Sequence, residues 1–173
     1  MEIGLLLIRL ALGLTLAAHG AQKLFGIFGG YGISATGAFF DSIGFRPGKP
    51  LAFLAGAGEL LGGLALALGL LTPLAAAAIL STMIVAVWGV HLEKGFFVQN
   101  GGYEYPLVLG VIATALAFSG PGNLSLDVAV LQLNLAGTSW GLSALALGFF
   151  GALPPLVSRS SWARGAPVPE VKG

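Results

Sequence analysis

The chain has 173 residues, of which 56% are hydrophobic and only 9% are charged, and its mean hydropathy is +0.92. Soluble domains carry about 25% charged residues, so this composition excludes an ordinary soluble fold and predicts a membrane protein. With a net charge of +1 and no basic cluster, no nucleic-acid partner is expected, and the absence of cysteine excludes disulfides, thiolate metal sites and a dithiol redox pair.

The first half of the chain contains three apolar segments of about 20 residues, the length that crosses a hydrocarbon core of about 30 Å. They run from about Ile3 to Phe28, from Leu51 to Leu71 and from Pro73 to His91. The Gly-rich connection between the first two contains SATGAFFDSIGF, which places its large apolar residues on one side of a short helix. This pattern predicts an interfacial or partly re-entrant element.

The second half of the chain predicts two further spans. A polar loop, HLEKGFFVQNGGYEYP, leads into a fourth span that has Pro106 in its first turn and ends at about Phe118. The cluster SGPGNLSLD then forms a turn, and residues 128–135 are apolar but too short to span. A fifth span is predicted at about 140–157, with two consecutive prolines that disfavour a helix at its end.

These elements predict an all-α fold, a polytopic transmembrane helix bundle with four core spans and a fifth, C-terminal span. The predicted organisation is a four-helix membrane bundle at 1–135, an extra transmembrane helix at 136–157 and a polar, disordered cytoplasmic tail at 158–173.

The positive charges support five spans and predict the orientation of the chain. Under the five-span arrangement, every Lys and Arg except Arg9 lies on one side of the membrane: Lys23, Arg46, Lys49, Lys94, Arg159, Arg164 and Lys172. Because Lys and Arg accumulate on the cytoplasmic side, we expect a bacterial cytoplasmic (inner) membrane protein with its N-terminus outside and its C-terminus in the cytoplasm.

Two charged residues are predicted to lie deep inside the spans, Arg9 in the first and Glu59 in the second. A charge at the bilayer centre costs about 2.5–3.5 kcal/mol on insertion scales, so each is expected to have a partner or a function. About 9 Å separates the two along antiparallel helices, a distance that an Arg side chain mostly covers. The two residues are either a structural ion pair or hydrogen-bonded anchor that fixes helix register, or a catalytic site in which the Glu59 carboxylate handles a proton or binds a ligand.

Glycines surround Glu59 in the second span, at Gly56, Gly58, Gly62 and Gly63. Small residues allow helix backbones to approach closely, so we expect tight helix packing on this segment.

A second polar group is predicted where the first and third spans end and the fourth begins. Its candidate ligand-binding residues are His19, Lys23, His91, Tyr103 and Glu104. A histidine with a tyrosine can hydrogen-bond the carbonyl oxygens of a quinone head group or another small polar ligand. The histidines lack metal-ligand spacing, so no metal is indicated, nor is haem or flavin. The alternative is simple interfacial anchoring, because Tyr and Trp are enriched at membrane surfaces.

Several motifs occur in order along the chain: RLALGLTLAAHGAQKLFG, GELLGGLALALGL, HLEKGFFVQNGGYEYPLVL and SGPGNLSLD. Over about residues 5–130 this pattern resembles the DoxX family of small bacterial and archaeal membrane proteins. The resemblance implies a four-helix membrane bundle, from which the fifth span departs. The motif residues that carry over are Arg9, His19, Lys23, Glu59, His91, Gly101, Glu104 and Asp127.

The resemblance also implies a function, because some relatives resemble subunits of quinone-linked thiosulfate oxidation and others belong with membrane oxidoreductase complexes. It implies a subunit of a quinone-linked membrane oxidoreductase system, with quinone as cofactor and a membrane or soluble oxidoreductase subunit as partner. A homo-oligomer in the lipid bilayer is a further expectation. Two alternatives stay open, a non-catalytic scaffold or assembly protein and a small-molecule permease, although no inverted repeat is visible.

Overall fold

The computed structural model describes residues 2–165, with side chains as far as Arg159. Its α-helices are α1 (Glu2–Phe25), α2 (Gly32–Ser42), α3 (Gly48–Leu68), α4 (Thr72–Ala86), α5 (Glu104–Ser119), α6 (Leu126–Ala129) and α7 (Thr138–Gly165). Shorter turns follow α4: the π-helix η1 (Val87–His91) and the 3-10 helices η2 (Leu92–Lys94) and η3 (Val98–Asn100). The described part of the chain contains no strand, which confirms the predicted all-α class.

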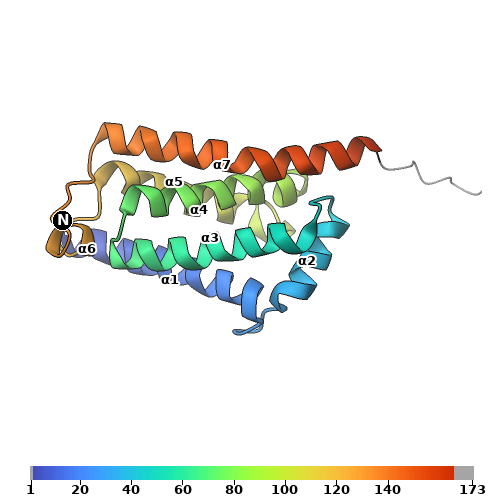
Figure 1. Ribbon diagram of the computed structural model, residues 1–173, viewed down its shortest axis with the longest axis horizontal. Helices are drawn as coiled ribbons and strands as arrows, with labels where there is room; N and C mark the ends of the chain where they lie inside the picture. Colours follow the sequence, from blue (N-terminus) through green and yellow to red (C-terminus); the bar gives the residue numbers. More distant parts are fainter. Residues whose placement is uncertain (1, 166–173) are drawn as a thin grey trace, which may run out of the picture.

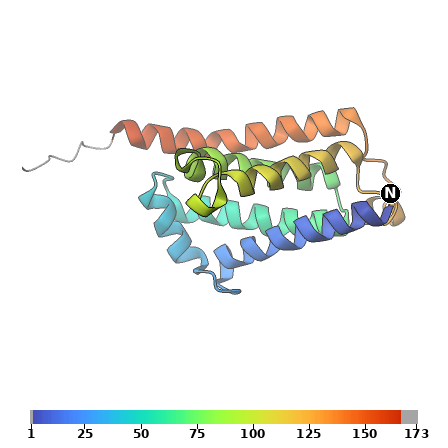
Figure 2. The ribbon, with the colours of Figure 1, turned by 180° about the vertical axis from the view of Figure 1, so that it is seen from behind.

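Helices α1, α3, α4, α5 and α7 run along the length of the bundle in alternating directions (Figure 1). Figure 2 shows the same order from behind, with α1 and α5 in front. One end, which we call the α6 end, carries the start of α1, the α3–α4 turn and α6. The opposite end, the α2 end, carries the end of α1, α2 and the α4–α5 connection.

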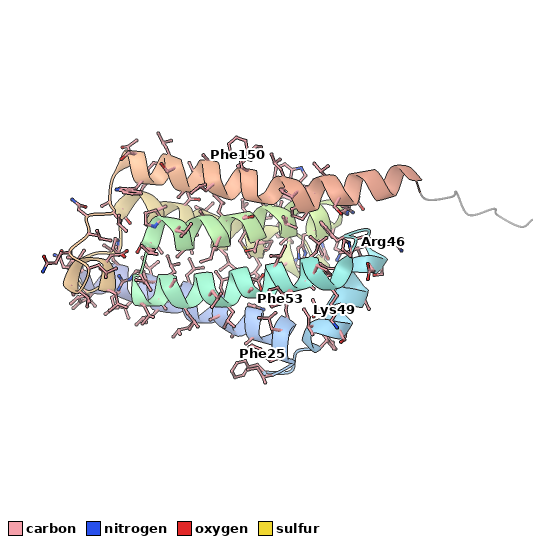
Figure 3. All side chains as sticks on the ribbon, viewed as in Figure 1. Phe25, Arg46, Lys49, Phe53 and Phe150 are labelled. Carbon is pink, nitrogen blue, oxygen red and sulfur yellow. The ribbon has the colours of Figure 1, made fainter. Side chains whose placement is uncertain are left out.

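Within the described part of the chain, four helical segments are long and apolar enough to cross a membrane: α1, α3, the stretch Thr72–Lys94 and the segment Thr138–Arg159 of α7. Helix α5 is a shorter apolar helix of 16 residues. Large apolar side chains cover the outside of the bundle; Phe150, for example, projects from α7 away from its neighbours (Figure 3). Such a surface suits lipid, and the helical membrane bundle predicted from the sequence is confirmed.

Helices α1 and α3 pack closely because glycines face backbone atoms across their interface. A Cβ atom on Gly13 would collide with the carbonyl oxygen of Gly63, and one on Gly20 would collide with that of Gly56. This close approach sets the register of the two helices. Tight packing on the glycine-rich segment was expected from the sequence.

The α7 helix differs from the predicted domain organisation at its C-terminal end. The sequence predicted a disordered tail from Ser158, but the helix continues to Gly165, and both Pro154 and Pro155 lie within it. Membrane helices tolerate internal proline where neighbours compensate for the lost hydrogen bonds. Here Ser158 Oγ donates to the carbonyl of Arg46 at 2.6 Å, which ties α7 to the α2 end. The rest of the predicted tail, 166–173, lies outside the described residues.

Candidate functional site

The central feature of the site is an ion pair between Lys23 on α1 and Glu59 on α3. The Glu59 side chain is 8% exposed and that of Lys23 is 28% exposed, so the carboxylate is buried and the ammonium only partly so. The close packing of α1 on α3 at Gly20 and Gly56 brings the two helices near enough for this contact. Both partners were candidate site residues in the sequence, although in different groups.

The suggested pairing of Arg9 with Glu59 is wrong. Arg9 is fully buried, but its guanidinium donates from Nη1 to the carbonyl of Pro121 at 2.6 Å and from Nη2 to that of Leu124. The reason is the direction of side chains, which lean toward the N-terminus of their own helix. On α1 the Arg9 side chain therefore points away from Glu59 along the helix axis, and the Lys23 side chain points toward Glu59.

Arg9 belongs instead to a set of hydrogen bonds at the α6 end that involves Asp127. The fully buried Asp127 carboxylate accepts from the backbone N–H of Leu71 at 2.6 Å and from that of Thr72 at 3.0 Å. It also accepts from Thr72 Oγ1 at 2.8 Å. Asp127 therefore caps the N-terminus of α4 from a distant part of the chain, where a negative charge is favourable. Arg9 and Asp127 hold the α6 end together and lie at a distance from the Lys23–Glu59 pair.

A cavity of about 180 Å³ lies beside the ion pair, between α1, α3, α4 and α5. Lys23, Glu59, His19, His91 and Tyr105 supply its polar lining. His19 Nε2 lies 3.3 Å from the hydroxyl of Tyr105, and the Tyr105 side chain is exposed at the surface of the bundle. This polar cavity thus reaches from the buried carboxylate of Glu59 toward the outside of the protein.

The π-helix η1 positions His91 in this lining. Its Nδ1 lies 2.6 Å from the carbonyl oxygen of Gly101, which can only accept, so Nδ1 carries the proton. In the neutral ring the other nitrogen, Nε2, is then an acceptor. Isolated π-turns of this kind are often found at functional sites.

Two residues predicted for this site lie elsewhere. Glu104 accepts a hydrogen bond from the backbone N–H of Val98 at 3.0 Å, and the Tyr103 ring packs edge-on against Phe96 with their centres 5.5 Å apart. Both therefore order the α4–α5 connection. The sequence also places Tyr105 in this polar group, and it is Tyr105, two positions after Tyr103, that lines the cavity. Its spacing of four from Leu109, another residue of the cavity wall, was the available signal.

A larger cavity of about 380 Å³ lies on the other side of the ion pair, between α2, α3, α4 and α7. Its walls are mostly apolar, with aromatic rings from α2 and from Phe45. Lys23, Glu59 and His91 border this apolar cavity as well as the polar one. The ion pair and His91 therefore separate an apolar chamber from a polar chamber that leads to the surface.

No group of three or more His, Cys, Asp or Glu side chains that could hold a metal occurs among the described residues. What the arrangement offers is a set of hydrogen-bond donors and one carboxylate at the end of an apolar chamber. Such a combination suits a ligand with a polar head and an apolar body.

Comparison with known proteins assigns the family. The DoxX family profile matches residues 4–92. A Bacillus subtilis protein named "Putative oxidoreductase CatD" is 35% identical over 131 residues, which cover 76% of this chain and 90% of that protein. An uncharacterized protein of Haemophilus influenzae is 32% identical over 65 residues, which cover 38% of this chain and 43% of that protein. No solved structure matches the chain significantly. The chain belongs to the DoxX family.

Proposed function

We propose that this protein is a membrane subunit of a quinone-linked oxidoreductase system and holds a quinone head group beside Lys23, Glu59 and His91. One observation carries the proposal: these three residues, together with Ala86, line both the apolar and the polar cavity. The name of the Bacillus subtilis relative, "Putative oxidoreductase CatD", supports redox chemistry as the setting.

The chemistry of the lining residues fits a quinone. Its ring carbonyl oxygens accept hydrogen bonds, and the Lys23 ammonium has three N–H donors, of which the ion pair with Glu59 uses one. The hydroxyl of Tyr105 is a further donor in the polar cavity. An apolar cavity of about 150 Å³ already holds benzene, so the polar cavity of about 180 Å³ has room for a quinone ring.

Glu59 is the proton-handling residue of this proposal. Reduction of a bound quinone takes up two electrons and two protons, and the electrons would come from a membrane or soluble oxidoreductase partner. Glu59 is the one carboxylate among the described residues that line the two cavities. His19 and Tyr105 connect its surroundings to the surface, so a proton can reach it by short steps between titratable groups.

The distribution of charge supports a location in the bacterial inner membrane with the α2 end in the cytoplasm. Lys23, Lys94 and Arg159 lie at the α2 end, as do Arg46 and Lys49, which Figure 3 labels. Since Lys and Arg accumulate on the cytoplasmic side, the N-terminus would lie outside and the head-group site would face the cytoplasm. Reporter fusions to each end of the chain test this orientation.

A non-catalytic scaffold is the second candidate, and one observation favours it. Lys23 and Glu59 satisfy each other, and a charge pair between two helices can serve only to fix their register. In that case the residues around the pair would affect stability without any ligand.

The two candidates are separated by quinone binding to protein reconstituted in lipid nanodiscs. The titration uses a quinone with a minimal tail and compares wild type with Glu59→Gln, Lys23→Met and the control Glu93→Gln on an exposed turn. A hydrogen bond from a charged donor contributes about 1.5–3 kcal/mol; Lys23→Met removes that donor and Glu59→Gln removes the carboxylate that positions it. We therefore expect saturable binding that weakens about tenfold or more in the two site variants and is unchanged in the control. Absence of saturable binding to the folded wild type would overturn the proposal and leave the scaffold.

A further inference from the structure

Helix α7 forms one wall of the apolar cavity although it lies outside the segment that the family profile matches. It packs mainly on α4 and α5, and it contributes Gly151, Pro154 and Pro155 to the cavity lining. The opposite wall is formed by Leu51, Leu54 and Ala55 of α3. The chamber is therefore a cleft between α3 and α7, with α4 behind it.

The wall on α7 lies close to α4 at the edge of the cleft. A Cβ atom on Gly151 would lie 3.0 Å from Oγ of Ser81, which also lines the cleft, so the glycine allows α7 to pack closely against α4 there. The two prolines next to it present rigid apolar rings.

The cleft opens to the lipid-facing surface of the bundle. Two of its lining residues are themselves well exposed, Leu54 at 63% and Phe39 at 47%. Its charged residues, Lys23 and Glu59, are gathered near His91, whereas the walls on α3 and α7 are apolar. A ligand in this cleft would meet polar groups at one point and apolar groups along the rest of its length.

We infer that the cleft between α3 and α7 holds the isoprenoid tail of the quinone, and that α7 makes the protein selective for a tailed quinone. This inference rests on the proposed function. Because the cleft opens sideways to the bilayer, a tailed quinone moves from lipid into the site without crossing water. Lipid is as apolar as the cleft, so the tail gains affinity through close packing rather than through the hydrophobic effect.

The test measures how much an isoprenoid tail adds to quinone affinity in nanodiscs of fixed lipid composition. Two quinones with the same ring are titrated, one without a tail and one with a single isoprene unit, and Kd is expressed per concentration in the lipid. The variants are Gly151→Leu on α7 and Ala55→Leu on α3, both of which fill the cleft. Ala115→Leu, at an exposed position of α5, is the matched control.

At the affinity per atom typical of drug-sized ligands, five tail carbons strengthen binding about tenfold in wild type and in Ala115→Leu. In Gly151→Leu and Ala55→Leu we expect most of this gain to disappear, while the affinity for the tail-free quinone stays unchanged. If Gly151→Leu fails to fold, Ala55→Leu decides the matter from the opposite wall.

Three results would contradict the inference, and each points to a different error in it. A tail gain that is equal in all four proteins shows that the tail lies outside the cleft. A loss of tail-free binding in both cleft variants shows that the cleft holds the ring. If neither quinone binds wild type saturably, the proposed function itself fails, and the inference fails with it.

Discussion

Lys23 and Glu59 form an ion pair across the closely packed interface of α1 and α3, and the same two residues border both cavities of the site. The contact therefore connects the stability of the bundle with the chemistry proposed for it. Arg9, on the same helix as Lys23, has a separate set of partners at the α6 end. Each arrangement leads to its own predictions.

Lys23→Met and Glu59→Gln should be energetically coupled, because each removes one partner of the same contact. Residues in one ion pair typically show a coupling of about 0.5–3 kcal/mol in the free energy of unfolding. Arg9→Met and Glu59→Gln should instead be additive to within about 0.5 kcal/mol, because the two side chains share no partner. Double-mutant cycles measure both coupling energies, with unfolding in mixed detergent monitored by circular dichroism. A large coupling between Arg9 and Glu59 would contradict the structure.

Gly20→Ala should destabilise the bundle and weaken quinone binding, because the added Cβ collides with the backbone of Gly56 and Leu60. Overpacking of this kind costs about 1–3 kcal/mol, and here it also moves Lys23 away from Glu59. Gly4→Ala is the matched control on the same helix, since a Cβ there meets nothing within 4 Å. The change in the free energy of unfolding, measured for each variant, should differ between the two in sign or clearly in size. Equal changes would argue against the close α1–α3 contact.

Tyr105→Phe should reduce quinone affinity, whereas Tyr103→Phe should leave it unchanged. Only the Tyr105 hydroxyl lies in the polar cavity, at 3.3 Å from Nε2 of His19. Loss of a neutral hydrogen bond costs about 0.5–1.5 kcal/mol, which weakens Kd by about twofold to tenfold. The nanodisc titration with the tail-free quinone measures both variants. A larger loss of affinity in Tyr103→Phe than in Tyr105→Phe would place Tyr103 in the site, as the sequence predicted.

Asp127→Asn should lower stability without affecting quinone affinity. The carboxylate accepts three hydrogen bonds from Leu71 and Thr72, and an amide provides one oxygen acceptor in place of two. We expect a loss of about 1.5–3 kcal/mol, the range for a hydrogen bond to a charged group. Thermal unfolding gives the stability, and a titration below the unfolding temperature gives Kd. A selective loss of binding in the folded variant would place Asp127 in the functional site.

Sequence reasoning predicted the helical bundle and the burial of Arg9 and Glu59, because both depend on local properties. An apolar run of about 20 residues predicts a span by itself, and a charge within such a run must be enclosed by protein. Apart from the end of α7, which continues to Gly165, the helix positions were correct to within about five residues for the same reason.

The partners of the buried charges could not be predicted with the same means. Distances along the helix axis favoured Arg9 as the ion-pair partner of Glu59. The direction of the side chains and the register of α1 on α3 at Gly13 and Gly20 make Lys23 the partner instead. The carbonyl acceptors of Arg9 come from the loop at Pro121 and Leu124, more than a hundred residues away along the chain. No periodicity or motif in the sequence reports such contacts. The role of α7 as a cavity wall likewise depends on packing between distant segments.

The most direct test of the proposed head-group site is photoaffinity labelling of the wild-type protein with an azidoquinone in nanodiscs, followed by peptide mass spectrometry. The account predicts adducts on the α3 segment that contains Glu59 and on the α4–η1 segment that contains His91, and it predicts that unlabelled quinone suppresses them. Adducts spread over exposed residues such as Phe150 and insensitive to unlabelled quinone would contradict a quinone site beside Lys23 and Glu59.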